Sequence, residues 1–159
     1  PSFLLHTDWK GVMEEHGIDT AKGRSDRQDP RAPLTNEEAE KVYAVLREYR
    51  STEENRNLLQ AALQKYEGTQ FFHNFTKGLK PGQAQARRYI ETFRAQDPVV
   101  VDGIEWIPTQ VLGQSFLLHQ IRKMIAVAID VARGAAPLEF MDKALDKKKS
   151  HSIILLPCA

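Results

Sequence analysis

The sequence predicts an α+β fold, in which an antiparallel sheet carries helices packed on one face. Apolar residues recur at helical spacing before residue 67, alternate as in a strand from residue 87, and return to helical spacing from about residue 115. The elements therefore follow the order helix, helix, strands, helix, helix and strand. Because a short turn joins the strands, we expect them to pair antiparallel. A chain of 159 residues is long enough for a real core, and we expect residues 1–159 to form a single domain.

The first 34 residues show little regular pattern. Residues 1–5 are short and apolar, which suits an edge strand or an incoming strand. Residues 6–34 are polar and contain three glycines and two prolines. We expect this stretch to be a polar loop or a disordered insert.

Two helices are expected next, and each has a polar start signal. Thr35–Glu38 has the pattern of a capping box, and five apolar residues then mark one helical stripe up to Tyr49. Ser51–Glu54 repeats the start signal, and apolar residues continue at helical spacing to Tyr66, after which Gly68 ends the helix. Both stripes are typical of contacts with the core.

The middle of the chain predicts strands. Residues 71–75 are crowded with aromatic side chains and show no clear period, which favours a loop that plugs the core. Residues 87–93 alternate between polar and apolar, and residues 104–116 predict a second strand. Asp102–Gly103 supplies the hairpin turn before that strand.

Two more helices and a strand complete the expected order. Residues 115–134 predict an apolar helix, and residues 137–145 predict a shorter one that begins at a proline. The three lysines at 147–149 are more often a solvated turn than a ligand site. Residues 152–156 are apolar and predict a final strand.

Composition and charge give only weak information about function. The chain is 42% hydrophobic and 27% charged, as is ordinary for a globular domain. Its net charge is only +1, but residues 1–60 hold 9 basic and 12 acidic residues, whereas residues 61–159 hold 13 and 9. This asymmetry gives mild support to a nucleic-acid surface on the second part.

The sequence gives no sign of a disulfide, a membrane span or a metal site. The single cysteine, Cys158, cannot form an internal disulfide and fits a reducing compartment. No apolar run reaches the ~18 residues that a bilayer requires. The five histidines are scattered, and none has a cysteine or histidine at ligand spacing. We therefore expect no membrane contact and no metal.

Arg122 places a charged side chain on a helix face that the sequence predicts to be apolar. On a helix its neighbours would be Leu118, Ile125 and Ala126, so that face should be buried. A guanidinium cannot lose its proton, so its burial costs several kcal/mol, roughly, unless a carboxylate or a phosphate meets it. The alternative is that Arg122 lies at the helix edge and extends to water.

Two motifs resemble those of the TruA-type tRNA pseudouridine synthases, in the eukaryotic branch. Residues 113–125, Gly-Gln-Ser-Phe-Leu-Leu-His-Gln-Ile-Arg-Lys-Met-Ile, are similar to G-x-x-F-x-x-H-Q-(I/V)-R-K-(M/I)-(V/I). Residues 65–76, Lys-Tyr-Glu-Gly-Thr-Gln-Phe-Phe-His-Asn-Phe-Thr, resemble K-Y-x-G-T-H-x-F-H-N-F-T. Between them, residues 86–90 resemble the family's arginine-led strand. The resemblance covers about residues 56–159, together with the first few residues.

The chain departs from the family pattern in three ways. Gln70 stands where the family has a histidine, so this position cannot titrate, and Ala126 replaces a glycine. The family's catalytic aspartate lies in G-R-T-D-x-G-V-(H/S)-A, in an N-terminal half that we expect to precede Pro1. Gly23–Asp26 imitates the start of this motif, but it lacks the following glycine and valine and lies among polar residues. We do not expect Asp26 to be the nucleophile.

The resemblance implies the C-terminal half of a pseudouridine synthase fold and an enzyme that isomerises uridine in tRNA or other structured RNA without a cofactor or metal. An aspartate of the missing N-terminal half would attack the target nucleotide, which must first leave its stack. Arg122 would pair with this aspartate and keep it ionised and aimed. The expected partners are tRNA and that N-terminal half, and the chain alone is expected to be inactive.

The remaining site residues follow from the basic turn, the strand after it and the family motifs. The expected RNA-binding residues are Lys77, Lys80, Arg87, Arg88 and His119. The residues that the resemblance places at the wall of the cleft are Phe72, Phe75, Gln114 and Phe116.

Two other function classes stay open. A non-catalytic RNA-binding or scaffold module could keep this fold, although Arg122 within an intact motif favours the enzyme. An unrelated α+β domain that contacts DNA would need a helix rich in base-reading residues, which the sequence does not offer. The expected compartment is intracellular: the nucleus by family resemblance, with the mitochondrion or the cytoplasm as alternatives.

Overall fold

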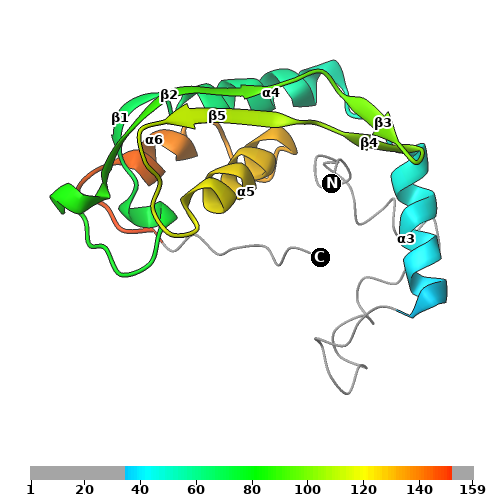
Figure 1. Ribbon diagram of the computed structural model, residues 1–159, viewed down its shortest axis with the longest axis horizontal. Coiled ribbons are helices and arrows are strands. Elements are labelled where there is room, and N and C mark those ends of the chain that lie inside the picture. The colour runs from blue at the N-terminus through cyan, green and yellow to red at the C-terminus, as the bar shows by residue number, and fades with distance from the viewer. Residues whose placement is uncertain (1–34, 152–159) are drawn as a thin grey trace. The chain divides into compact units, whose positions relative to one another are not determined.

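The computed structural model describes residues 35–151 of the chain (Figure 1). These residues belong to two compact units. The smaller consists of residues 35–51 and 98–107, and the larger of residues 52–97 and 108–151. Each unit has its own antiparallel sheet.

Several sequence predictions fall outside this range. The edge strand at residues 1–5, the polar loop or insert at 6–34 and the final strand at 152–156 lie outside the described residues. They stay predictions, as does the single domain over residues 1–159.

The smaller unit contains one helix and one hairpin. Helix α3 (Asn36–Glu48) begins directly after Thr35, where the capping-box pattern predicted a start. Strands β3 (Val99–Val101) and β4 (Ile104–Trp106) pair antiparallel. At Asp102–Gly103 the two φ angles are 52° and 80°, which is the left-handed backbone that a tight hairpin turn requires. The predicted hairpin turn is confirmed.

A buried carboxylate organises the smaller unit. Glu105 is 5% exposed, and its side chain accepts a hydrogen bond from the Ser51 backbone N–H at 2.8 Å. Burial, and then the charge of Glu105, raise the pKa of Tyr49 to about 12. The Tyr49 phenol therefore keeps its proton at pH 10, where an ordinary tyrosine is half ionised.

The larger unit is built on a three-stranded antiparallel sheet in the order β1–β2–β5. β1 (Gly68–Phe71) pairs with β2 (Arg87–Ala95), and β2 pairs with β5 (Thr109–Gly113). Antiparallel strands with helices confirm the predicted α+β fold class.

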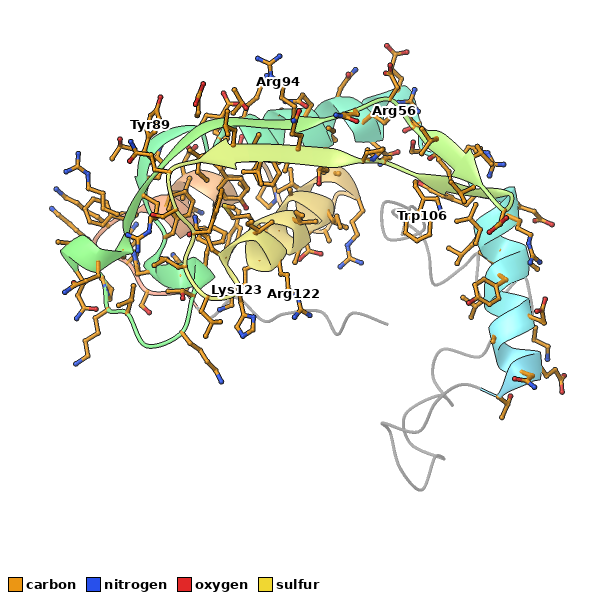
Figure 2. The ribbon with its side chains drawn as sticks, in the orientation of Figure 1. Arg56, Tyr89, Arg94, Trp106, Arg122 and Lys123 are labelled. Carbon is orange, nitrogen blue, oxygen red and sulfur yellow. The ribbon has the colours of Figure 1, made fainter. Side chains whose placement is uncertain are left out.

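Three helices accompany this sheet. They are α4 (Glu53–Gln64), α5 (Gln120–Ala132) and the short α6 (Phe140–Leu145). α4 packs against both β2 and α5. On β2, Ile90 and Phe93 are fully buried, whereas the exposed side chain of Arg94 points away from α5 (Figure 2).

Aromatic rings fill the core between the helices and the sheet. Tyr66, Phe72, Phe75 and Phe93 are all 0% exposed. The rings of Tyr66 and Phe75 meet edge to face, with their centroids 5.3 Å apart. The Tyr66 hydroxyl donates to the backbone oxygen of Met124 at 3.0 Å, which ties the end of the α4 segment to α5. Its polar end is thus satisfied inside the core.

Two predicted strand boundaries are wrong. Residues 104–116 are not one strand, because Pro108 offers no N–H to a ladder, and the stretch divides into β4 and β5. The aromatic-rich stretch after Gly68 was expected to be a loop, but it begins with β1. Gly68 enters this strand with a φ of 85°, and its partner is β2.

The helix boundaries also differ from the predictions. α4 is capped by Thr52, whose hydroxyl accepts from the Asn55 N–H at 3.1 Å, and not by Ser51. The helix expected from residue 115 begins only at Gln120, because His119 has a φ of 62° and interrupts helical geometry. The short helix expected from residue 137 begins at Phe140.

Candidate functional site

Counted along the chain, the first family motif is residues 65–76 and the second is residues 113–125, and the first turn of α5 carries part of the second. Before it, the Leu117 N–H donates to the side-chain oxygen of Gln120 at 2.8 Å, so a fully buried glutamine fixes the approach to the helix. His119 is half-buried and takes the N-cap position in left-handed geometry. The turn that follows has a defined start although its N-cap side chain makes no capping hydrogen bond.

Arg122 lies on the outer side of this turn. Its side chain is exposed and leaves α5 on the side away from the strands (Figure 2). The expected burial of its apolar neighbours is wrong: Leu118 is 65% exposed, and Ile125 and Ala126 are partly exposed. Leu118 precedes the helix, so the helical spacing that placed it beside Arg122 does not apply.

The next residue, Lys123, has the opposite environment. It is 9% exposed, and its amine donates to the backbone oxygens of Thr76 at 3.2 Å and Asn74 at 3.5 Å. Burial, and then the charge of Lys77, lower the pKa of Lys123 below its usual value. The amine therefore ties α5 to the segment that carries the first motif.

Sequence reasoning missed Lys123. One signal was available, because Lys123 stands four residues before Val127 and one before Met124, both of which belong to the buried side of α5. A cation on an apolar helix face needs acceptors, and here the backbone supplies them.

A second hydrogen bond joins the two motifs. The Thr76 hydroxyl donates to the Leu118 backbone oxygen at 3.0 Å. The segment that follows η2 (His73–Phe75) is thus bonded both to the approach and to the first turn of α5. Two motifs that are far apart in the sequence, residues 65–76 and 113–125, thus meet at Leu118 and Lys123.

The four residues expected at a cleft wall divide into two groups. Phe72 and Phe75 are 0% exposed, so their side chains fill the core, as expected for an aromatic stretch that plugs it, and their place beside a cleft stays a prediction. Gln114 is exposed and Phe116 is partly exposed. Gly113, the last residue of β5, leaves no room for a side chain, since a Cβ there would lie 2.9 Å from the Tyr89 backbone oxygen.

The expected RNA-binding residues differ in their exposure and hydrogen bonding. Lys77, Lys80 and Arg87 are exposed. Arg88 is half-buried, and its guanidinium donates to the backbone oxygens of Gln85 at 2.8 Å and Arg87 at 2.7 Å. Arg88 is therefore at least partly structural, whereas the side chains of the two lysines extend into solvent.

Gln70, which stands where the family motif has a histidine, lies on β1. Its backbone is in register with Arg88 of β2, and its side chain is partly exposed. Over residues 35–151 no three potential metal-ligating side chains come together. In the same part of the chain, every helix lacks the length and apolar character needed to cross a membrane.

A family model described as tRNA pseudouridine synthase matches residues 62–158, a range that contains both motifs. Among curated relatives, tRNA pseudouridine synthase 1 of Schizosaccharomyces pombe is 43% identical over 65% of this chain and 20% of its own length. tRNA pseudouridine synthase 2 of the same yeast is 37% identical over 80% of this chain and 28% of its own length.

A third relative is matched over most of the chain. It is tRNA pseudouridine synthase 1 of Yarrowia lipolytica, which is 34% identical over 92% of this chain and 29% of its own length. The chain thus spans less than a third of the length of each of these relatives.

Proposed function

Since this chain belongs to the tRNA pseudouridine synthase family, we propose that it forms the C-terminal part of an enzyme that isomerises uridine to pseudouridine in tRNA. In the proposed reaction an aspartate attacks the target nucleotide, and the glycosidic bond between uracil N1 and ribose C1′ breaks. The base is then rejoined to C1′ through its carbon C5, C5 loses its hydrogen to solvent, N1 takes up a proton, and the aspartate is released. The target base must leave its stack to reach the aspartate. Residues 1–159 supply one wall of the active site, and the aspartate comes from residues outside this range.

The observation that carries the proposal is the position of Arg122. It is exposed on a helix turn whose other side is buried, and it lies within the family motif. An exposed guanidinium on a fixed turn can receive a carboxylate in a two-point geometry. In the dry interior of a closed active site, the pKa of an isolated aspartate would rise, and a paired guanidinium opposes that rise. The nucleophile then stays ionised.

The tRNA backbone would lie against the basic turn and the start of β2. Lys77, Lys80 and Arg87 are exposed. The lysine ammonium groups and the arginine guanidinium can donate hydrogen bonds to phosphate oxygens. His119, next to the first turn of α5, is the proposed contact nearest in sequence to Arg122. Arg88 contributes less, because it is half-buried and one nitrogen of its guanidinium already donates to two backbone oxygens.

A non-catalytic RNA-binding module is the competing function. It would need the basic surface but would have no use for a guanidinium placed to receive a carboxylate. Arg122 within the matched region therefore favours the enzyme.

The test compares the whole protein with residues 1–159 alone. Each is incubated with tRNA that carries tritium at uridine C5, and tritium release reports isomerisation. We expect release by the whole protein and none by residues 1–159. Release by residues 1–159 would place the nucleophile within this chain and contradict the proposal. RNA binding without release by the whole protein would establish the non-catalytic module.

A further inference from the structure

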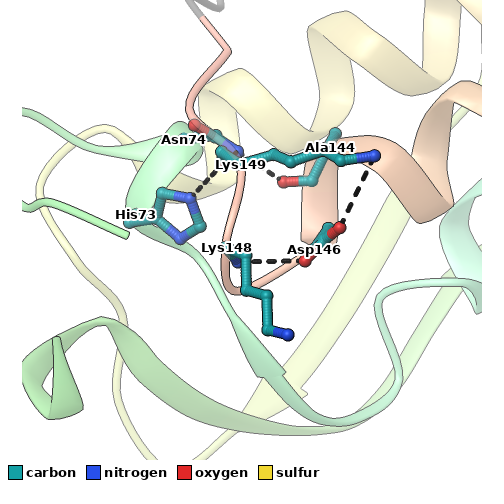
Figure 3. A network of polar contacts seen from close by, with 6 residues as sticks. All are labelled: His73, Asn74, Ala144, Asp146, Lys148 and Lys149. Atoms are coloured by element: carbon teal, nitrogen blue, oxygen red, sulfur yellow. Dashed lines mark hydrogen bonds and ion pairs between the residues drawn. The ribbon is translucent and has the colours of Figure 1, made fainter. Parts of the chain in front are cut away.

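The turn after α6 is fixed by two buried side chains of the first motif (Figure 3). His73 is 4% exposed, and its Nε2–H donates to the backbone oxygen of Lys149 at 2.6 Å. Asn74 is 4% exposed and donates to the backbone oxygens of Ala144 at 2.8 Å and Lys149 at 3.1 Å. Its side-chain oxygen accepts from the His151 N–H at 2.7 Å.

The single acid of this turn stabilises the turn itself. Asp146 accepts from the Lys148 N–H at 2.9 Å, and its other oxygen lies 3.8 Å from the Lys149 amine. The carboxylate thus closes the turn at its first residue, as aspartate commonly does. Lys147, Lys148 and Lys149 are all exposed.

The three exposed lysines fit the solvated turn that the sequence favoured, but the backbone of this turn is also anchored. Two polar side chains are buried beneath it, and buried polar groups are costly unless they are bonded. The bonds that satisfy His73 and Asn74 fix the backbone of the lysine turn. A turn that is already fixed loses less entropy when its lysines bind a ligand.

The same turn adjoins the basic loop between η2 and β2. A Cβ built at Gly82 would lie 3.9 Å from the Lys147 backbone oxygen, and Figure 1 shows the chain after α6 at the same end of the unit as that loop. Residues 73–88 hold four lysines and arginines and no acidic residue, and residues 143–151 hold four lysines and one acidic residue. Two neighbouring loops thus form one cationic surface.

We propose that Lys147 and Lys148, on the turn anchored by His73 and Asn74, extend this surface and bind phosphates of the RNA backbone. The identity of the ligand rests on the proposed function, whereas the surface rests on the contacts above. Phosphate contacts of this kind orient the RNA without reading its sequence. Lys149 contributes less, because its amine faces Asp146.

The test measures binding of an unmodified tRNA transcript by the whole protein over a range of KCl concentrations. Lys147→Gln with Lys148→Gln removes two charges without touching the anchor. We expect the slope of log affinity against log salt to fall by about two units and the Kd near 150 mM salt to rise on the order of tenfold. The matched control, Lys41→Gln with Arg94→Gln, removes the same charge from two exposed positions elsewhere and should change the slope by less than about half a unit.

A second variant tests the anchor. His73→Phe keeps a ring but removes the donor to the Lys149 backbone, so the lysines remain while the turn loses a tie. We expect a several-fold rise in Kd, and an unchanged Kd would show that the anchor has no part in binding. If Lys147→Gln with Lys148→Gln changes the salt slope and the Kd no more than its control does, the proposed phosphate contacts are wrong.

Tritium release by the unmutated protein separates the two proposals. Isomerisation together with a null result at Lys147 and Lys148 would leave the function standing and overturn the surface. A lowered salt slope in a protein that releases no tritium would support the surface and overturn the enzymatic function.

Discussion

Arg122 and Lys123 are consecutive cations on the first turn of α5, and they occupy opposite environments. Arg122 is exposed on the outer side, whereas Lys123 is 9% exposed and bonded to two backbone oxygens of the segment that carries the first motif. Consecutive helical residues point about 100° apart, so one turn can present one cation outward and bury the next.

The difference separates positioning from chemistry. The buried amine holds the turn in place, together with the Thr76 hydroxyl and the Tyr66 hydroxyl, which donate to the backbone at Leu118 and Met124. The Arg122 guanidinium is exposed on another side of the turn and is the group proposed to receive the carboxylate. We therefore expect changes at Arg122 to affect turnover and changes at Lys123 to affect stability.

The largest expected effect is on turnover at Arg122. In the whole protein, Arg122→Ala and Arg122→Lys should lower kcat about 100-fold or more, because the proposed aspartate loses its two-point partner. The Kd for tRNA should stay within about twofold, since this side chain is not proposed to bind phosphate. Tritium release and filter binding measure the two quantities.

Arg94→Ala is the matched control for that prediction, because Arg94 is exposed on β2 and points away from α5. Its kcat should be unchanged. Near-normal turnover by Arg122→Ala would show that the exposed cation of α5 has no catalytic part.

The next effect is on stability at Lys123. Lys123→Met keeps most of the buried side-chain volume but leaves the oxygens of Asn74 and Thr76 without this donor. We expect a loss of about 1–2 kcal/mol in the free energy of unfolding by urea. Arg122→Met at the exposed neighbour should change it by less than about 0.5 kcal/mol. Equal losses at the two positions would remove the distinction between them.

The sequence predicted what local pattern controls. The start of α3 after Thr35, the alternation of β2 and the Asp102–Gly103 turn all concern neighbouring residues, and the structure has each of them. β1 was missed because its short, irregular stretch becomes a strand only through pairing with β2.

The environment of α5 could not be predicted from local pattern. His119 is an ordinary residue for a helix, and nothing nearby in sequence requires its φ of 62°. Because the helix starts after it, the burial argument for Arg122 used a neighbour that is not on the helix. Lys123 is satisfied by oxygens some 50 residues earlier, so its environment depends on tertiary contact. The family resemblance drew attention to Arg122 for another reason, which is its motif.

A smaller effect is expected at Tyr66, which braces the buried side of α5. Tyr66→Phe keeps the ring in the aromatic core and removes only the donor to Met124. We expect a loss of about 1 kcal/mol in the free energy of unfolding. The turnover of the whole protein at a permissive temperature should stay within about threefold, since the other ties of this turn remain. A loss of turnover like that of Arg122→Ala would show that this brace alone sets the catalytic geometry.

The smallest expected effect is a pH dependence that only the buried cation produces. Burial, and then the charge of Lys77, lower the pKa of Lys123 below 10.5 in the folded chain. Between that lowered pKa and 10.5, the unfolded chain keeps a proton that the folded chain has lost, so this group makes the free energy of unfolding rise with pH. Burial raises the pKa of Tyr66, which has the opposite effect above pH 10, but Tyr66 is present in wild type and Lys123→Met alike.

Urea unfolding of both proteins should therefore show the advantage of wild type over Lys123→Met growing as pH approaches 10.5. The same comparison made in a Lys77→Met background should show weaker growth, because the second cause is gone. A difference that stays flat or shrinks with pH would mean that folding does not lower the pKa of Lys123.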